Sequence, residues 1–440
     1  MRRNILFVYT ILTISLLLQS CTKNNDDTPA DNKNIFTFKV SERYIAENDT
    51  CIDDRAWVLI YSLDNTLLFE QELKNGQIYS SLLPDDGPVN VQLVTARFSQ
   101  TGYDRNFYDI KVYTKVIPDT WVLGPGIKKD HEPLGTTNVV LKDISINDYN
   151  YSLLKSSSAD GNYLSSSNNT FKIPLYYNPD AVWLNFQSIN GTPLYKWIDG
   201  VSLDETMTIW KKDLILMNNV DVEYPPNEHA YIYVEGIDLS SNDDIYSECY
   251  HTYDIDSQTS VKAYYPSNVF SDFWVYYYAR QGNVSNYYTK TAPAIPLKFE
   301  LLDTDLSVLH NSVRSFNALF NGPFDYFRTV WHYYAKHSYE NHRFTYSIYG
   351  AAEDAIDYYA PDIPSSIVSV DEDMIDIEQL EYSYTKIVED NYIDNYINFI
   401  EDYRNEPHKI QVQGAEQKYK YIYNPDAKKE FLYQEEENMR

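Results

Sequence analysis

Three things are scarce in this sequence: basic residues, cysteines and, beyond residue 21, long apolar runs. Its 36 Lys and Arg are outnumbered by 64 Asp and Glu, which gives a formal charge of −28 at pH 7. Binding to the phosphate backbone of a nucleic acid depends on clusters of Lys and Arg. This charge balance therefore excludes nucleic-acid binding through a general basic surface. The acidity favours solubility and mutual repulsion, and divalent cations at selected acidic clusters are the alternative interpretation.

Familiar catalytic signatures are also missing. The chain has no HExxH zinc motif, no GxSxG nucleophile elbow, no P-loop and no GxGxxG dinucleotide motif. Cys51 and Cys249 have no convincing histidine partner motif, and they fall in different predicted domains. We therefore expect two thiols rather than a disulfide, and a function without catalysis.

The first 20 residues have the composition of a secretory signal. Arg2 and Arg3 precede an apolar run over residues 5–18, which is shorter than the roughly 20 residues needed to cross a bilayer. The run ends in Leu18-Gln19-Ser20-Cys21, with a small residue directly before the cysteine. This ending resembles a bacterial lipobox, and the resemblance implies cleavage before Cys21 and acylation of that thiol. Two or three acyl chains would anchor the protein to a membrane stably.

Residues 21–33 are polar and contain nothing to bury, so they are predicted to form a flexible tether. In this tract Lys23 is followed by the acidic pair Asp26 and Asp27, which resembles the surface-export signal of Bacteroidota lipoproteins. The resemblance implies an outer-membrane lipoprotein that is displayed on the cell surface. A plain linker is the alternative.

Short alternating runs separated by turns dominate the rest of the chain, for example residues 36–40, 89–93 and 231–234. Tyrosine is unusually common, with 43 copies, and it suits half-buried sheet faces. Exposed tyrosines that stack on sugar rings are the other interpretation. Since hydrophobic residues make up 43% of the chain, packed cores are expected. The pattern predicts an all-β fold of tandem Ig-like or transthyretin-like sandwiches with a decorated C-terminal part.

An internal repeat supports this architecture. Residues 54–69 match residues 180–195, and a weaker copy begins at Trp274. In each copy a strand that carries a tryptophan runs into an Asp-Asn, Asn-Gly or Gln-Gly turn and then into a second strand. We expect each tryptophan to pack in the core beneath its hairpin.

The repeat predicts three units: residues 34–145, residues 146–258 and a larger part at residues 259–440, which could be one decorated sandwich or two small ones. In the first unit, turns at Leu63-Asp64-Asn65, Asn75-Gly76 and Pro84-Asp85-Asp86-Gly87 separate strand-like runs. This order is similar to carboxypeptidase-regulatory and transthyretin-like modules. The resemblance implies a fold and an extracellular setting, and it transfers no active site.

The densest group of histidines lies in the predicted C-terminal part. If residues 327–334 and 343–348 form a hairpin, its loop could gather His337, Glu340 and His342 around a metal ion. Polar hairpin residues without a metal are the alternative, and no cofactor is expected. Closely spaced carboxylates also occur at residues 371–378, 303–305 and 254–256. These carboxylates could be Ca²⁺ ligands, or they could form solvated acidic turns. The sequence contains no EF-hand loop.

These observations lead to a hypothesis about function. We expect a lipid-anchored, non-enzymatic β-sandwich protein of the cell envelope that binds a glycan or a protein partner. One alternative is a structural or adhesive subunit of an envelope assembly. The other is a hydrolase with an unrecognised carboxylate or metal site in the C-terminal part.

Overall fold

The computed structural model describes residues 34–42, 44–45, 52–99, 106–124, 132–149, 151–156, 162–164, 169–188, 191–238, 245–252, 255, 258–337, 340–368, 376–393, 396, 400 and 414–426. The fold is all-β, as predicted. Short helical turns among the described residues include η1 (Ile146–Asp148), η2 (Lys211–Asp213), α2 (Ser365–Val368) and η3 (Ile377–Gln379). Across the described residues, none of the helices has the length and apolar character needed to span a membrane.

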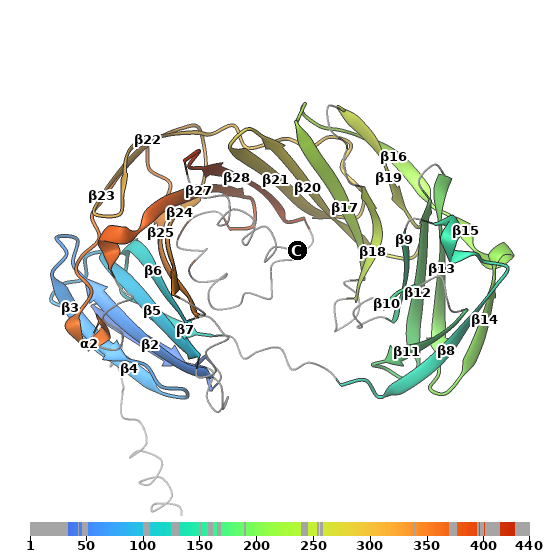
Figure 1. Cartoon of the computed structure of the whole chain (residues 1–440), viewed down its shortest axis with the longest axis horizontal. Helices are drawn as coiled ribbons and strands as arrows, with labels where there is room; N and C mark the ends of the chain where they lie inside the picture. The colour runs from blue at the N-terminus through green and yellow to red at the C-terminus, as the bar shows by residue number, and fades with distance from the viewer. Residues whose placement is uncertain are drawn as a thin grey trace, which may run out of the picture.

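One twelve-stranded sheet forms the body of the molecule and bends into an arch (Figure 1). Its strands, in spatial order, are β18 (Ile245–Thr252), β17 (His229–Asp238), β20 (Asp272–Gln281), β21 (Val284–Ala292), β28 (Glu416–Tyr423), β27 (Glu381–Asp390), β24 (Tyr326–His337), β25 (Glu340–Ala351), β6 (Asn106–Val116), β5 (Val89–Ser99), β2 (Ile52–Tyr61) and β3 (Leu67–Glu72). Neighbouring strands are antiparallel, apart from the parallel pair β25 and β6.

Strand pairing crosses both boundaries expected from the sequence. At the boundary after residue 145, β6 of the first predicted unit pairs with β25 of the third. At the boundary after residue 258, β17 of the second unit pairs with β20 of the third. The alternating pattern marks where strands lie, but it does not specify a partner that is distant in the chain. The three predicted units therefore share a sheet.

Smaller sheets cover both faces of the large sheet near its β2 end. The sheet of β22 (Asp305–Ser312), β23 (Ser315–Asn321) and β26 (Ala355–Tyr358) packs on one face, where Phe316 meets Trp331 with ring centroids 5.0 Å apart. The sheet of β4 (Ile78–Leu82), β1 (Ile35–Val40) and β7 (Thr120–Leu123) packs on the other face, where Trp121 meets Tyr113 at 5.2 Å. The intervening strands are consequently buried on both sides: in β2, Trp57 and Leu59 face one core while Val58 and Ile60 face the other.

The opposite limb of the arch contains a separate sandwich (Figure 1). The sheet of β8 (Gly135–Lys142), β11 (Thr170–Leu175) and β14 (Thr206–Trp210) packs on a second sheet, made of β9 (Tyr151–Ser156), β10 (Asn162–Tyr163), β12 (Asp180–Ser188), β13 (Gly191–Val201) and β15 (Ile215–Leu216). Val139, Leu184 and Phe186 lie in their shared core. A two-stranded sheet of β16 (Asn218–Glu223) and β19 (Ser260–Tyr265) covers β17 and β20.

The three tryptophan hairpins predicted from the repeat are present as β2–β3, β12–β13 and β20–β21. Asn65 and Gly282 in two of the turns have positive φ angles of 66° and 58°, which suits these residue types. Trp57 and Trp183 are buried in cores, as expected. The expectation was wrong for Trp274, which is half-buried on the sheet face opposite the core of its own hairpin. Its position in the strand alternation places it on that face.

Candidate functional site

The predicted histidine hairpin exists. Strands β24 and β25 pair along their whole length, and His337 lies opposite Glu340 while His342 lies opposite Ala335. The side chains of residues 335–342 lie outside the described ones, so the metal site at His337, Glu340 and His342 stays a prediction. Among the residues that are described, no three or more His, Cys, Asp or Glu side chains group in a way that could hold a metal ion.

The neighbouring His332 is a buried histidine that forms a hydrogen bond within the sheet. It is 1% exposed, and its Nε2 lies 3.3 Å from Nη2 of Arg343, which donates to it. Burial, together with repulsion from Arg343 and Arg328, lowers the pKa of His332 to about 3. The imidazole is therefore neutral at pH 7 and accepts a hydrogen bond within the sheet.

The acidic clusters make local contacts where they are described. The Asp376 carboxylate accepts hydrogen bonds from the backbone N–H of Glu378 at 3.0 Å and from Nε2 of Gln379 at 2.9 Å. Glu378 pairs with Nε of Arg314 at 3.0 Å. These contacts support the interpretation as a solvated acidic turn. Residues 371–375, Asp254 and Asp256 lie outside the described residues.

Two of the three cysteines, Cys21 and Cys51, lie outside the described residues, so lipidation of Cys21 stays a prediction. Cys249 is buried in the core beneath β17 and β20, and its carbonyl oxygen accepts a hydrogen bond of 2.8 Å from Nδ2 of Asn185. This contact joins the sandwich limb to β18 of the large sheet.

Many tyrosines form a continuous array on one face of the large sheet. Ring centroids are 4.9 Å apart between Tyr231 and Tyr278, 5.0 Å between Tyr278 and Tyr287, and 4.7 Å between Tyr287 and Tyr419. Nζ of Lys386 lies 4.2 Å from the centroid of the Tyr419 ring. Most rings of the array are buried, which supports the structural interpretation of the tyrosine content. In the described part of the chain, the aromatic side chains that are highly exposed are Trp210 and Tyr359, at 41% and 55%.

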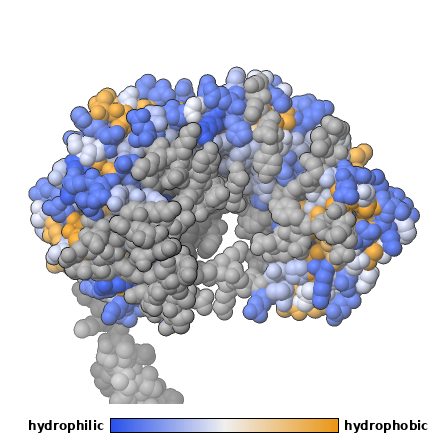
Figure 2. Space-filling model, in the orientation of Figure 1, coloured by the Kyte–Doolittle hydropathy of each residue, from blue (hydrophilic) through white to orange (hydrophobic). Residues whose placement is uncertain are grey.

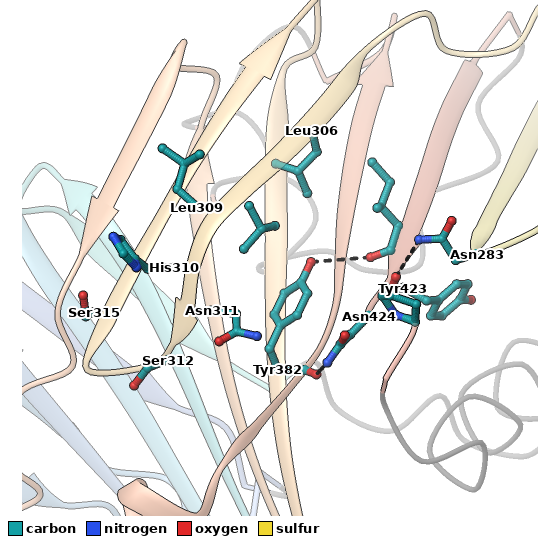
Figure 3. Close-up of a pocket in the computed structure, with 13 residues that line it drawn as sticks. Asn283, Leu306, Leu309, His310, Asn311, Ser312, Ser315, Tyr382, Tyr423 and Asn424 are labelled. Atoms are coloured by element: carbon teal, nitrogen blue, oxygen red, sulfur yellow. Dashed lines mark hydrogen bonds between the residues drawn. The ribbon is translucent and has the colours of Figure 1, made fainter.

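A cavity of about 500 Å³ lies beside the edge strand β22, within the range of about 300–1,000 Å³ typical of small-ligand pockets (Figure 3). Strand β22 supplies one wall, Tyr382 of β27 lies between the walls, and the end of β28 and the β20–β21 turn supply the other. The lining residues are Asn283, Leu306, Val308, Leu309, His310, Asn311, Ser312, Ser315, Tyr382, Ile422, Tyr423, Asn424 and Pro425. We call it the β22 cavity.

Hydrogen bonds hold the walls of the β22 cavity in place (Figure 3). Nδ2 of Asn283 donates to the carbonyl oxygen of Tyr423 at 2.9 Å, and Nδ2 of Asn424 donates to the carbonyl oxygen of Tyr382 at 2.9 Å. Within the described residues, Oδ1 of Asn283 receives no hydrogen bond. On the other wall, the indole N–H of Trp331 donates to the carbonyl oxygen of Asn311 at 2.7 Å and ties β22 to the large sheet. The site is therefore preformed.

The chemistry of the β22 cavity is polar and uncharged. Its thirteen described lining residues include amides, hydroxyls, the imidazole of His310 and the phenol of Tyr382, but no Asp, Glu, Lys or Arg, although these make up 23% of the chain. The ring of Tyr423 packs against Tyr384 on the opposite face of the sheet. Burial raises the pKa of Tyr382 to about 12, so its phenol stays protonated at neutral pH. A charged ligand would lose its hydration without gaining a counter-charge, whereas a neutral ligand with many hydroxyl groups would find donors and acceptors.

This cavity was not predicted from the sequence. Its walls come from the β20–β21 turn, β22, β27 and the end of β28, which span about 140 positions, and no local motif links them. A scan against family models and a search of curated proteins each found no match to the chain.

Proposed function

We propose that this protein is a lipid-anchored, non-enzymatic protein of the cell envelope that binds a neutral glycan in the β22 cavity. The observation that carries the proposal is the lining of that cavity, which combines hydrogen-bonding side chains, the phenol of Tyr382 and aliphatic groups, with no Asp, Glu, Lys or Arg. Sugar rings offer hydroxyls for hydrogen bonds and apolar faces for aromatic and aliphatic contacts, so they fit this combination.

The anchor is proposed from the N-terminal sequence. A lipobox-like end at Cys21 and the polar tract of residues 21–33 would tether the β-structure to the outer membrane, and the acidic pair after Lys23 favours display on the cell surface. A formal charge of −28 agrees with this placement, as does the mostly hydrophilic character of the coloured residues in Figure 2.

The experiment is a glycan array probed with the soluble protein that begins after residue 33, with neutral and acidic glycans on the same surface. We expect binding to neutral glycans, unchanged by a metal chelator, because His310 is the one imidazole among the described lining residues and no Asp, Glu or Cys lies beside it there to complete a metal site. The variant Asn311→Ala removes an exposed amide of the wall, and Asn219→Ala on the exposed face of β16 is its matched control. Binding to acidic glycans alone, or equal binding by both variants, would count against the proposal.

A second candidate function, contact with a protein of an envelope assembly, is favoured by β4. This strand lies at the edge of its sheet, and Ile78 and Leu82 are 65% and 72% exposed on one of its faces. An exposed edge strand with apolar side chains can pair with another chain. Crosslinking in intact cells should then trap a partner, and Ile78→Lys should abolish that product. A chain that stays monomeric after crosslinking contradicts this candidate.

A further inference from the structure

A second cavity, of about 250 Å³, lies where the β2–β3 turn, the end of β6 and strand β26 meet. At about 30 Å³ for each water molecule, its volume equals that of roughly eight waters. The lining residues are Leu63, Asn65, Asn90, Thr114, Lys115, Phe327, Ile348, Gly350, Ala351, Glu353, Ile356, Asp357, Tyr358 and Tyr359. We call it the Asp357 pocket. None of these residues lines the β22 cavity.

The Asp357 pocket carries charge, unlike the β22 cavity. Nζ of Lys115 lies 2.6 Å and 2.7 Å from the two carboxylate oxygens of Glu353, so these two groups neutralise each other. Asp357 is exposed, and within the described part of the chain its carboxylate has neither an ion pair nor a hydrogen bond. The lining therefore keeps one negative charge, in a chain of charge −28 that attracts cations.

A buried amide also faces this pocket without its full set of partners. Asn90 is 9% exposed, and its Oδ1 accepts a hydrogen bond of 3.0 Å from the backbone N–H of Lys115. Its Nδ2 donates no hydrogen bond to any described residue. This N–H group is open to solvent rather than enclosed in the core, so an oxygen of a ligand can take the place of water as its acceptor.

An aromatic ring stands at the rim. The side chain of Tyr359 is 55% exposed, and the guanidinium carbon of Arg314 lies 5.7 Å from its ring centroid. The ring thus already lies beside one cation, and its exposed part can receive a second. Ile348, Ile356 and Phe327 give the pocket an apolar wall.

We propose that the Asp357 pocket binds a small hydroxylated primary amine, such as an amino sugar or an amino alcohol. The ammonium group pairs with the Asp357 carboxylate beside the Tyr359 ring, and a hydroxyl oxygen accepts the hydrogen bond of Asn90. This binding is separate from the glycan binding proposed for the β22 cavity, because the two cavities share no residue.

The test is calorimetric titration of the soluble protein with glucosamine and ethanolamine, and with ethylene glycol, which has a hydroxyl in place of the ammonium group of ethanolamine and is not a sugar. We expect heat of binding with at least one amine and none with ethylene glycol. Asp357→Asn keeps the shape and removes the charge, and it should weaken amine binding by roughly tenfold or more. Tyr359→Ala should weaken it as well. Asp221→Asn, an exposed strand carboxylate on β16, is the matched control and should bind as the wild type does.

Two results would overturn this inference: ethylene glycol binding as tightly as ethanolamine, or an Asp357→Asn variant with unchanged amine affinity. Absence of heat with both amines at millimolar concentration would overturn it too. Neutral-glycan binding measured on the same Asp357→Asn sample shows whether the protein is folded, and it separates failure of this inference from failure of the proposed function.

Discussion

The side-chain amide of Asn283 donates a hydrogen bond of 2.9 Å to the carbonyl oxygen of Tyr423, which lies 140 positions further along the chain. The bond joins the tight turn between β20 and β21 to the end of β28. Both residues line the β22 cavity, so the contact that joins the β20–β21 turn to the end of β28 also sets one wall of the proposed glycan site (Figure 3).

Replacing this amide should have a small effect on stability and a larger one on binding. Asn283→Ala removes one hydrogen bond, which contributes about 1 kcal/mol to the free energy of unfolding, and it frees the wall to move. Urea unfolding followed by tryptophan fluorescence measures the first effect, and titration with the bound glycan measures the second. If the variant Asn283→Ser keeps both the unfolding free energy and the glycan affinity of the wild type, then this wall does not position the ligand.

Trp331 should be among the most sensitive core positions. It is 0% exposed, packs against Phe316, and its indole N–H donates to the carbonyl oxygen of Asn311 on β22. Trp331→Phe keeps most of the volume but leaves that carbonyl without its donor, at a cost of about 1–3 kcal/mol. Trp331→Ala should cost about 3–5 kcal/mol. Thermal unfolding scans of both variants check this order, and an Ala variant as stable as the Phe variant would contradict it.

Stability should fall with pH because of His332. Its pKa in the folded state, about 3, lies below the value of about 6.5 expected for the unfolded chain, so the unfolded state binds the proton first. The stabilisation is complete above pH 6.5 and is lost as pH falls towards 3, by about 2 kcal/mol between pH 7 and pH 5. The control is His332→Gln, which keeps an acceptor for Arg343 and cannot titrate. Parallel pH profiles for the wild type and this variant would exclude His332 as the cause.

Cys21 should carry the lipid. The full-length protein expressed in a Gram-negative host is expected to incorporate an alkyne-labelled fatty acid and to fractionate with the outer membrane, whereas Cys21→Ala should lose the label. Cys51→Ala is the matched control and should keep it. A label that persists in Cys21→Ala would contradict the lipobox interpretation.

Local features of the fold could be predicted from the sequence. Hairpins such as the one after Trp57 depend on alternation within a few residues and on a turn residue, Asn65, that tolerates a positive φ angle. The histidine hairpin was predictable for the same reason. The all-β class follows from many such segments, each with its own local signal.

Partners that are distant in the chain could not be predicted. The parallel pair β25–β6 places His342 opposite Asn106, and nothing within either segment specifies the other. The β22 cavity depends on the same kind of pairing, since Asn283, Tyr382 and Asn424 meet only when β20, β27 and β28 lie in one sheet. Individual asparagine and tyrosine residues are too common in this chain to mark a site.

The central claim is that the β22 cavity binds a neutral glycan, and the most direct test is a titration of the best array ligand into a double variant, His310→Ala with Asn311→Ala. Both side chains are exposed on the edge strand, so the variant should fold as the wild type does. The account predicts an affinity lower by roughly tenfold or more, since two hydrogen-bonding groups are lost, and an unchanged affinity for the Asn219→Ala control. A double variant that binds the glycan as tightly as the wild type would contradict the account.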